Sequence, residues 1–184
     1  MRLFIAIEID PAIVEKLEAI RGRLRKADAD VKWVEPENSH LTIKFIGEAD
    51  AGKADEIKAA IARAAESVQP FELAIGAVGC FPKGRPRVLW IGAEDASGNF
   101  QRLHAGIDAG LAPLGIERDG RAFTAHLTLG RIRSAKNIWK LIELLNAEDA
   151  ADLGRSRVDS VTLFESKLSP RGPTYTPLAH IKLG

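Results

Sequence analysis

The tripeptide His-Leu-Thr occurs twice in this chain, at residues 40–42 and 126–128, which are 86 positions apart. The same separation relates the apolar segment around Leu3 to the apolar segment around Leu89. A supersecondary unit that recurs at a fixed interval predicts two related halves that pack on each other. We therefore expect residues 1–184 to form a single bilobal domain, duplicated from units of roughly 1–86 and 87–184 that exchange strands.

Each half has the order strand, helix, strand, helix, strand. In the first half we expect strands at 2–9, 40–46 and 71–78, a short extended segment at 31–34, and helices at 11–24 and 53–68. In the second half we expect strands at 87–93, 126–132, 158–164 and 175–183, a helix capped by Ser97 that runs to Leu111, and another around 138–145. This order predicts an α+β fold with largely antiparallel sheets, in which two pseudo-two-fold-related lobes enclose a central cleft.

The polar residues of each motif share one face of their strand. Side chains alternate across a strand, so His40 and Thr42 point the same way, with Lys44 beyond them. The second copy has the same parity, which pairs His126 with Thr128. The opposite faces are apolar and are expected in the core: Leu41, Ile43 and Phe45 in the first strand, Leu127 and Leu129 in the second. One such strand fits a half-exposed sheet, but its duplication favours a functional role.

These residue types suit phosphodiester hydrolysis by in-line attack, which needs a base for the attacking water and an acid for the departing oxygen. Histidine titrates near neutral pH, so one neutral and one protonated imidazole can coexist. The threonine hydroxyls are suited to donate to the non-bridging oxygens, whose negative charge must be held in the transition state. We therefore predict that one imidazole and one hydroxyl from each lobe hold a phosphate between them.

Paired histidines are also metal ligands. Catalytic zinc usually has three protein ligands, and neither His-Leu-Thr strand carries Asp, Glu or Cys on the face of its histidine. The other histidines, His104 and His180, lie outside the repeated strands. We therefore expect neither a metal ion nor an organic cofactor.

The charge balance restricts the class of partner. Lys plus Arg is 26 and Asp plus Glu is 25, a formal net charge of +1, whereas a protein that coats duplex nucleic acid carries a larger basic excess. A nucleic-acid substrate would be recognised locally, at an end or a single phosphate. The one cysteine excludes an internal disulfide, and the apolar run at residues 3–7 is too short for a signal peptide or a membrane span. We expect a cytoplasmic protein that binds no membrane.

The motifs His40-Leu41-Thr42-Ile43 and His126-Leu127-Thr128-Leu129 resemble the paired His-x-Thr-x motifs of the 2H phosphoesterases. The start RLFIAI (residues 2–7), the run RPRVLW (85–90) and the tail SPRGP (169–173) followed by Tyr175 are similar to the RNA 2',3'-cyclic phosphodiesterase branch, historically called 2'-5' RNA ligases. The likeness extends over essentially the whole chain, more closely in the strands than in the helices.

The resemblance implies a bilobal 2H phosphoesterase-like fold and hydrolysis of an RNA 2',3'-cyclic phosphate end, or of a related cyclic nucleotide, to a 2'-phosphate. It implies His40 as the proton donor to the departing 3' oxygen and His126 as the proton acceptor for water. It also implies that Thr42 and Thr128 bind the phosphate. The near-symmetry of the motifs does not by itself distinguish the acid from the base.

The resemblance further implies a phosphate-binding arginine after the second motif, a position that Arg131 matches. Strict alternation places Arg131 on the core face, opposite His126, where an unpaired guanidinium would be costly. A bulge or strand end at Gly130 would turn it into the cleft, and we expect Arg131 to bind the phosphate. Lys44 has the parity of His40 and either joins it there or points to solvent.

Aromatic residues are candidates to stack on a base. Trp90 and Trp139 lie in apolar strand and helix patterns, so core packing is expected for both. Trp33, just before an extended Val-Glu-Pro segment, and Phe81, in a Gly/Pro-rich turn, are the better stacking candidates.

For three further side chains the sequence also allows an interpretation without a functional role. Cys80 has no activating neighbour in the sequence and is expected to be a buried small hydrophobe. Arg85 and Arg87 flank a proline near the junction of the repeats and reach either the RNA backbone or only solvent.

Three classes of function remain. Hydrolysis is the leading prediction. Ligation would run the same site backwards, but the chain has no Gly-rich phosphate loop followed by Lys and Ser or Thr. A non-catalytic RNA or nucleotide binder would not need both histidines and both threonines, and all four are present. We expect a monomeric hydrolase with no obligate protein partner.

Overall fold

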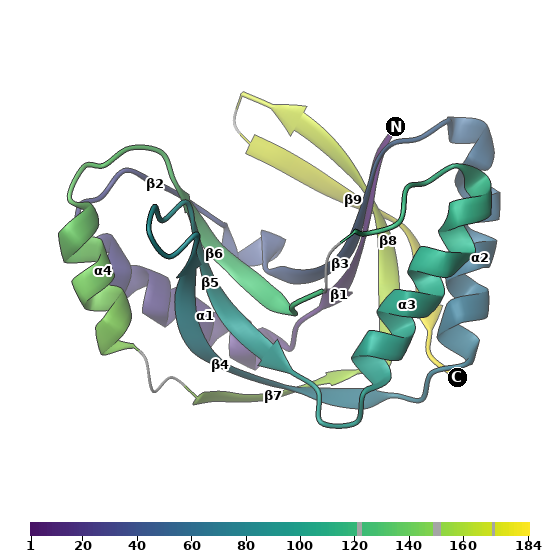
Figure 1. The fold of residues 1–184 in the computed structure, drawn as a ribbon, viewed down its shortest axis with the longest axis horizontal. Helices are drawn as coiled ribbons and strands as arrows, with labels where there is room; N and C mark the ends of the chain where they lie inside the picture. Colours follow the sequence, from purple (N-terminus) through teal and green to yellow (C-terminus); the bar gives the residue numbers. More distant parts are fainter. Residues whose placement is uncertain (121–122, 149–151, 171) are drawn as a thin grey trace.

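The computed structural model describes the chain except residues 121–122, 149–151 and 171. Two curled sheets form its body (Figure 1). The four-stranded sheet has the order β3 (His40–Glu48), β1 (Arg2–Glu8), β8 (Ser160–Ser169) and β9 (Gly172–Lys182). The five-stranded sheet has the order β2 (Val31–Trp33), β6 (His126–Ile132), β5 (Val88–Glu94), β4 (Phe71–Phe81) and β7 (Asp152–Val158). Neighbouring strands are antiparallel, so the predicted α+β fold is confirmed.

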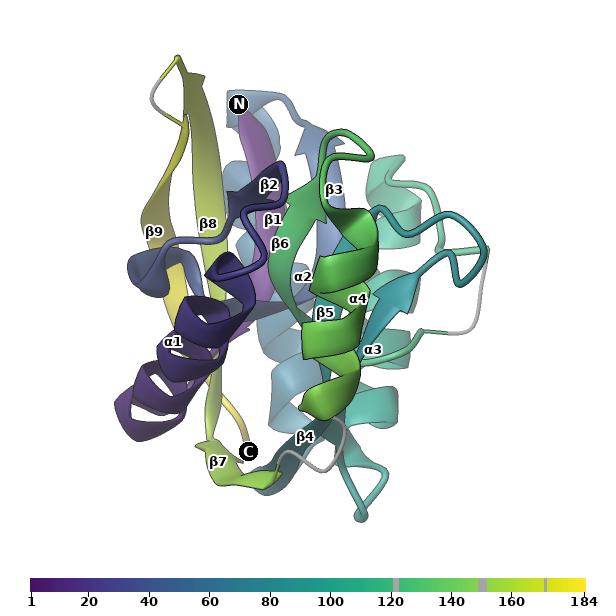
Figure 2. The same cartoon turned by 90° about the vertical axis from the view of Figure 1, so that its left-hand side faces the viewer.

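The α-helices among the described residues are α1 (Pro11–Arg25), α2 (Ala54–Glu66), α3 (Asn99–Leu111) and α4 (Ile138–Ala147). Helices α2 and α3 pack on each other at one side of the molecule, and α1 and α4 lie together at the other (Figures 1 and 2). Short 3-10 helices cover residues 36–38, 51–53 and 112–114. No helix in the described part of the chain has both the length and the apolar character needed to cross a membrane.

The helix starts follow local chemistry. Asp10 caps α1, because its Oδ1 accepts the N–H of Ala12 at 2.8 Å and Pro11 occupies the first turn. Gly98, and not the predicted Ser97, occupies the cap position of α3. The Ser97 hydroxyl nevertheless accepts the N–H of Asn99 at 3.2 Å, and the Asp95 carboxylate accepts the N–H of Phe100 at 2.8 Å.

Both sheets combine strands from the two halves of the sequence. Strands β8 and β9 complete the four-stranded sheet on the β1 side, and β2 and β4 lie in the five-stranded sheet with β5, β6 and β7. Strand β7 was not predicted, because its residues 152–158 are mostly polar and pair only with β4 at a sheet edge. Ser169 at the end of β8 pairs with Gly172 at the start of β9, and Arg171 of the tail lies outside the described residues.

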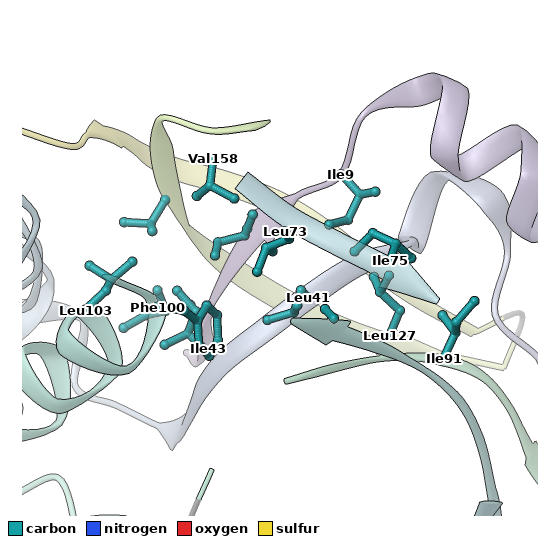
Figure 3. Close-up of a cluster of buried hydrophobic side chains, with 14 of the residues drawn as sticks. Ile9, Leu41, Ile43, Leu73, Ile75, Ile91, Phe100, Leu103, Leu127 and Val158 are labelled. Carbon is teal, nitrogen blue, oxygen red and sulfur yellow. The ribbon is translucent and has the colours of Figure 1, made fainter. Parts of the chain in front are cut away.

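The backs of the two motif strands meet in the core. Leu41 and Ile43 of β3 and Leu127 and Leu129 of β6 are at most 1% exposed. Figure 3 shows Leu41 and Leu127 close together beside Leu73 of β4. Burial of each such side chain contributes about 1.5–3 kcal/mol. Because these leucines and isoleucines are held in the core, the histidines and threonines between them must face the other way.

Candidate active site

Strand β3 contains a β-bulge directly after its motif. Thr42 and Lys44 pair with adjacent residues of β1, which leaves Ile43 as an extra residue. Beyond the bulge the alternation is reversed. Lys44 is consequently buried at 2% exposure, whereas Phe45 is 66% exposed. The expectation that Lys44 continues the face of His40 and that Phe45 packs in the core is therefore wrong.

Strand β6 has the same irregularity at the corresponding place. Thr128 and Gly130 pair with adjacent residues of β5, which leaves Leu129 extra. The bulge turns Arg131 out of the core, and it is exposed and lines the cavity described below. A side chain at position 130 would meet Val31, since a Cβ there would lie 2.7 Å from its Cγ1. The irregularity that Arg131 needs to reach the cleft is present.

The strand registers correct the alignment of the repeats. Lys44 pairs with Ile5, and Gly130, 86 residues after Lys44, pairs with Leu89. The first strands of the two halves therefore correspond at an offset of 84, since 89 − 5 = 84, and not at the 86 that aligned Leu3 with Leu89. A shift of two residues keeps every side chain on its own face, so the parity argument is unaffected.

The two motif strands line one cavity of about 1040 Å³ between the sheets. It brings together the five residues predicted from the sequence: His40, Thr42, His126, Thr128 and Arg131. Phe45 and Phe81 also line it. Neither threonine hydroxyl hydrogen bonds to another residue in the described part of the chain, so both are available to a ligand.

His126 is held in one tautomer by the backbone. Its Nδ1 lies 2.8 Å from the carbonyl oxygen of Thr124. A carbonyl only accepts, so Nδ1 carries the hydrogen. In the neutral ring Nε2 then has the free lone pair, which is what a general base requires. The ring also meets Phe81 edge-on, at 5.5 Å between centroids.

His40 lies in an aromatic environment. Its ring stacks on Phe4 at 5.0 Å and on Phe164 at 5.9 Å, and Tyr175 meets it edge-on at 5.2 Å. Neither ring nitrogen hydrogen bonds to a residue that the structure describes. Burial without such a partner lowers the pKa of His40 to about 4. The ring is therefore neutral at pH 7 in the free protein.

Lys44 belongs to a buried ionic network. Its Nζ lies 2.6 Å from Asp108 Oδ1, 3.0 Å from Asp119 Oδ1 and 2.9 Å from the carbonyl oxygen of Glu117. Burial alone would lower the pKa of Lys44, but the hydrogen bonds to the two carboxylates outweigh it and raise the pKa. Lys44 thus lines the same cavity as His40, as one of the two sequence alternatives has it, but its ammonium group is held by this network.

The same network reaches the segment that precedes β6. Asp119 Oδ2 lies 3.0 Å from His104 Nε2, and His104 stacks on Phe123 at 4.6 Å. Phe123 is adjacent to Thr124, whose carbonyl holds His126. No sequence signal connected these residues with the motifs, because Asp108 and Asp119 lie 64 and 75 residues from Lys44.

Arg131 is a free cation at the edge of the cavity. Within the described part of the chain it forms no ion pair with a carboxylate. It lies near Tyr175 of the other sheet, where burial raises the pKa of the phenol and the positive charge of Arg131 opposes that rise. An unpaired guanidinium beside two free hydroxyls is suited to bind an anion.

The aromatic residues considered as stacking candidates lie in different surroundings. Phe81 lines the cavity, as expected of a stacking residue. Trp33 does not, and the guanidinium of Arg25 lies 5.6 Å from its ring. Trp90 packs on the backbone of Gly79 and stacks on Phe81 at 5.0 Å.

The expectation of core packing is wrong for Trp139, which is 84% exposed. It lies two residues, about 200° of helix, from the buried Leu141 and so faces away from the core. Cys80 is half-buried against the core, and burial raises the pKa of its thiol, so it remains protonated. Across the described residues, no three side chains among His, Cys, Asp and Glu gather as a metal-binding group.

The chain matches the LigT-like phosphoesterase family twice, over residues 7–90 and 91–175. It belongs to that family. Among curated relatives, it is 36% identical to the RNA 2',3'-cyclic phosphodiesterase of Methanothermobacter thermautotrophicus, with 100% of this chain and 99% of the relative aligned. It is 37% identical to the protein of the same name from Archaeoglobus fulgidus, over 97% and 98% of the two chains.

Solved structures agree with the fold. A crystal structure of a Thermus thermophilus protein superposes with a TM-score of 0.81 at 28% identity and covers 100% of this chain and 98% of that one. Escherichia coli LigT in complex with 3'-AMP superposes with a TM-score of 0.80 at 25% identity, over 99% and 97%. This LigT-like phosphoesterase therefore shares the two-sheet architecture of the 2H superfamily throughout its length.

Proposed function

We propose that this protein hydrolyses the terminal 2',3'-cyclic phosphate of RNA to a 2'-phosphomonoester, with His40 and His126 as acid and base and without a metal ion. The observation that carries the proposal is a cavity lined by both histidines and both threonines of the duplicated motif. Two curated relatives aligned over nearly their whole length are named for this activity. The complex of Escherichia coli LigT with 3'-AMP adds a ribose phosphate as ligand of a related protein.

In this mechanism His126 Nε2 takes a proton from water, and the water oxygen forms a bond to phosphorus. The bond from phosphorus to the 3' oxygen breaks in line with the attack, and His40 transfers its proton to that oxygen. The hydroxyls of Thr42 and Thr128 and the guanidinium of Arg131 hold the non-bridging oxygens as their charge develops. One water is consumed, and the two histidines exchange protonation states.

The acid role of His40 depends on the substrate. Since the pKa of His40 is about 4 in the free protein, little of it is protonated at pH 7. A phosphate anion placed beside a buried imidazole favours the charged form and raises the pKa. Substrate binding therefore generates the acid that the reaction needs.

Product analysis tests the proposal. The EDTA-treated protein is incubated with an oligoribonucleotide that ends in a 2',3'-cyclic phosphate, and the phosphomonoester is identified. We expect a 2'-phosphate, formed without added metal and lost in His40→Ala and His126→Ala. A 3'-phosphate product would show that the 2' oxygen, and not the 3' oxygen, is the leaving group. Absence of turnover would refute the proposed hydrolase activity. Joined RNA at a yield comparable to that of hydrolysis would favour ligation.

A further inference from the structure

We infer that a basic track beyond the cavity binds the RNA backbone upstream of the cyclic phosphate, so that the enzyme prefers an oligonucleotide end to a free cyclic mononucleotide. The track comprises Lys32, Arg85, Arg87 and Arg133, all of which are exposed. The inference rests on the proposed function and adds to it a binding site for the RNA backbone outside the catalytic cavity.

Three separate segments bring these cations together. Lys32 of β2 is the direct cross-strand partner of Arg131. The carbonyl of Arg87 accepts the N–H of Ile132 at 2.8 Å, and the N–H of Arg133 donates to the Asp30 carbonyl at 2.9 Å. The β4–β5 turn, the end of β6 and the start of β2 are therefore joined by backbone hydrogen bonds at one end of the five-stranded sheet (Figure 1).

The three arginines of the track line one small hollow. A cavity of about 150 Å³ is lined by Arg85, Arg87 and Arg133, together with Ser134. Its lining contains no Asp or Glu. A hollow of this composition is suited to an anion of about the size of a phosphodiester group.

The positive charges of the track are not neutralised by neighbouring carboxylates in the described structure. None of its four cations forms an ion pair with a carboxylate within the described ranges of the chain. Like charges directly opposite each other across two strands are destabilising, and Lys32 faces Arg131 in this way. A bound anion such as an RNA phosphate would offset the repulsion between these two like charges.

The track adjoins the catalytic cavity at Arg131. Arg131 lines that cavity, Lys32 is its direct cross-strand partner, and Arg133 follows it by two residues, about 7 Å of extended backbone. A step of this size suits successive phosphates of an extended single strand. Phe81, 38% exposed at the start of the β4–β5 turn and edge-on to His126, offers a stacking surface at the junction. With a net charge of +1, the chain thus concentrates its affinity for RNA locally.

The experiment compares two substrates on matched variants. Hydrolysis of a 2',3'-cyclic mononucleotide and of a ten-residue oligoribonucleotide with the same cyclic end is measured over a series of salt concentrations. The track variant is Arg87→Gln/Arg133→Gln. The control is Arg63→Gln/Arg102→Gln, which removes the same charge from α2 and α3, remote from the track. Circular dichroism and thermal unfolding establish that both variants are folded.

We expect the track variant to raise KM for the oligonucleotide roughly tenfold and to leave the mononucleotide unchanged. The slope of log kcat/KM against log salt for the oligonucleotide should become shallower by about 1.4, since each contact to a single strand contributes about 0.7. An equal loss of kcat/KM on both substrates, no loss on either, or the same loss in the control variant would contradict the proposal that the track binds RNA. If the wild-type protein hydrolyses neither substrate, the proposed function fails instead.

Discussion

Strands β3 and β6 carry the same tripeptide and the same bulge, yet their histidines are in opposite surroundings. His40 is stacked among aromatic rings without a hydrogen-bond partner in the described structure, and burial lowers its pKa to about 4. His126 is oriented by the Thr124 carbonyl and has one nitrogen left for the substrate. Sequence duplication therefore preserved the backbone that aims the two imidazoles and did not preserve their electrostatics.

The positions after the two bulges differ as well. Lys44 in β3 is bound by two carboxylates, whereas the corresponding residue in β6 is Gly130. Phe45 then occupies the place in β3 that Arg131 occupies in β6. At this position after the bulge, β3 thus provides an aromatic ring and β6 a cation.

The largest expected effect comes from separating the two histidines chemically. His40→Ala and His126→Ala should each lower kcat for a cyclic-phosphate substrate by about 10²- to 10⁴-fold. On a 4-nitrophenyl phosphodiester of a nucleoside, whose leaving group needs no proton, the His126→Ala loss should persist and the His40→Ala loss should nearly vanish. The opposite pattern would exchange the roles. His180→Ala, outside the cavity, is the control.

Next in size is the effect of Lys44→Met on stability. It leaves Asp108 and Asp119 without their cation, which should lower the free energy of unfolding by about 3 kcal/mol. Lys140→Met, on the exposed side of α4, should change it by less than about 0.5 kcal/mol. Urea denaturation measures both, and equal values would show that the network contributes no stability.

A smaller effect on kcat/KM is expected from substituting the residues that follow the two bulges. Arg131→Gln should lower kcat/KM by about 10- to 30-fold, because it removes a charge-assisted contact to the phosphate. Phe45→Gln, the same final side chain at the corresponding position of β3, should lower it less than about threefold. If steady-state kinetics show equal losses, the two walls are not specialised in this way.

The smallest expected effect is the change in the pKa of His40 on binding product. NMR titration of the free protein should give a pKa of about 4, and a nucleoside 2'-monophosphate should raise it by at least about one unit, or 1.4 kcal/mol. The uncharged nucleoside should leave it unchanged, and a shift with both ligands would exclude an electrostatic cause. Because folding lowers this pKa from 6.5 to about 4, His40 makes the fold less stable as the pH falls through that range.

Much of the site was predictable because it depends on local periodicity. Alternation along a strand was enough to aim His40, Thr42, His126 and Thr128, and each lies where the pattern predicted. The same rule failed immediately beyond the motifs, at Lys44 and Phe45, because a bulge inserts one residue and reverses every later face. The strand sequence of β3 contains no glycine or proline at that point that would have indicated it.

The sequence by itself determined the family, the two-sheet α+β fold and the four polar residues of the duplicated motif, since these follow from short-range pattern and from repetition. Only the tertiary structure decided which histidine is desolvated, where Arg131 points and what Lys44 binds. Those properties depend on groups that folding brings from far along the chain. Tyr175 meets His40, and Asp119 meets Lys44. Desolvation and ion pairing act through space, so no periodicity in the sequence records them.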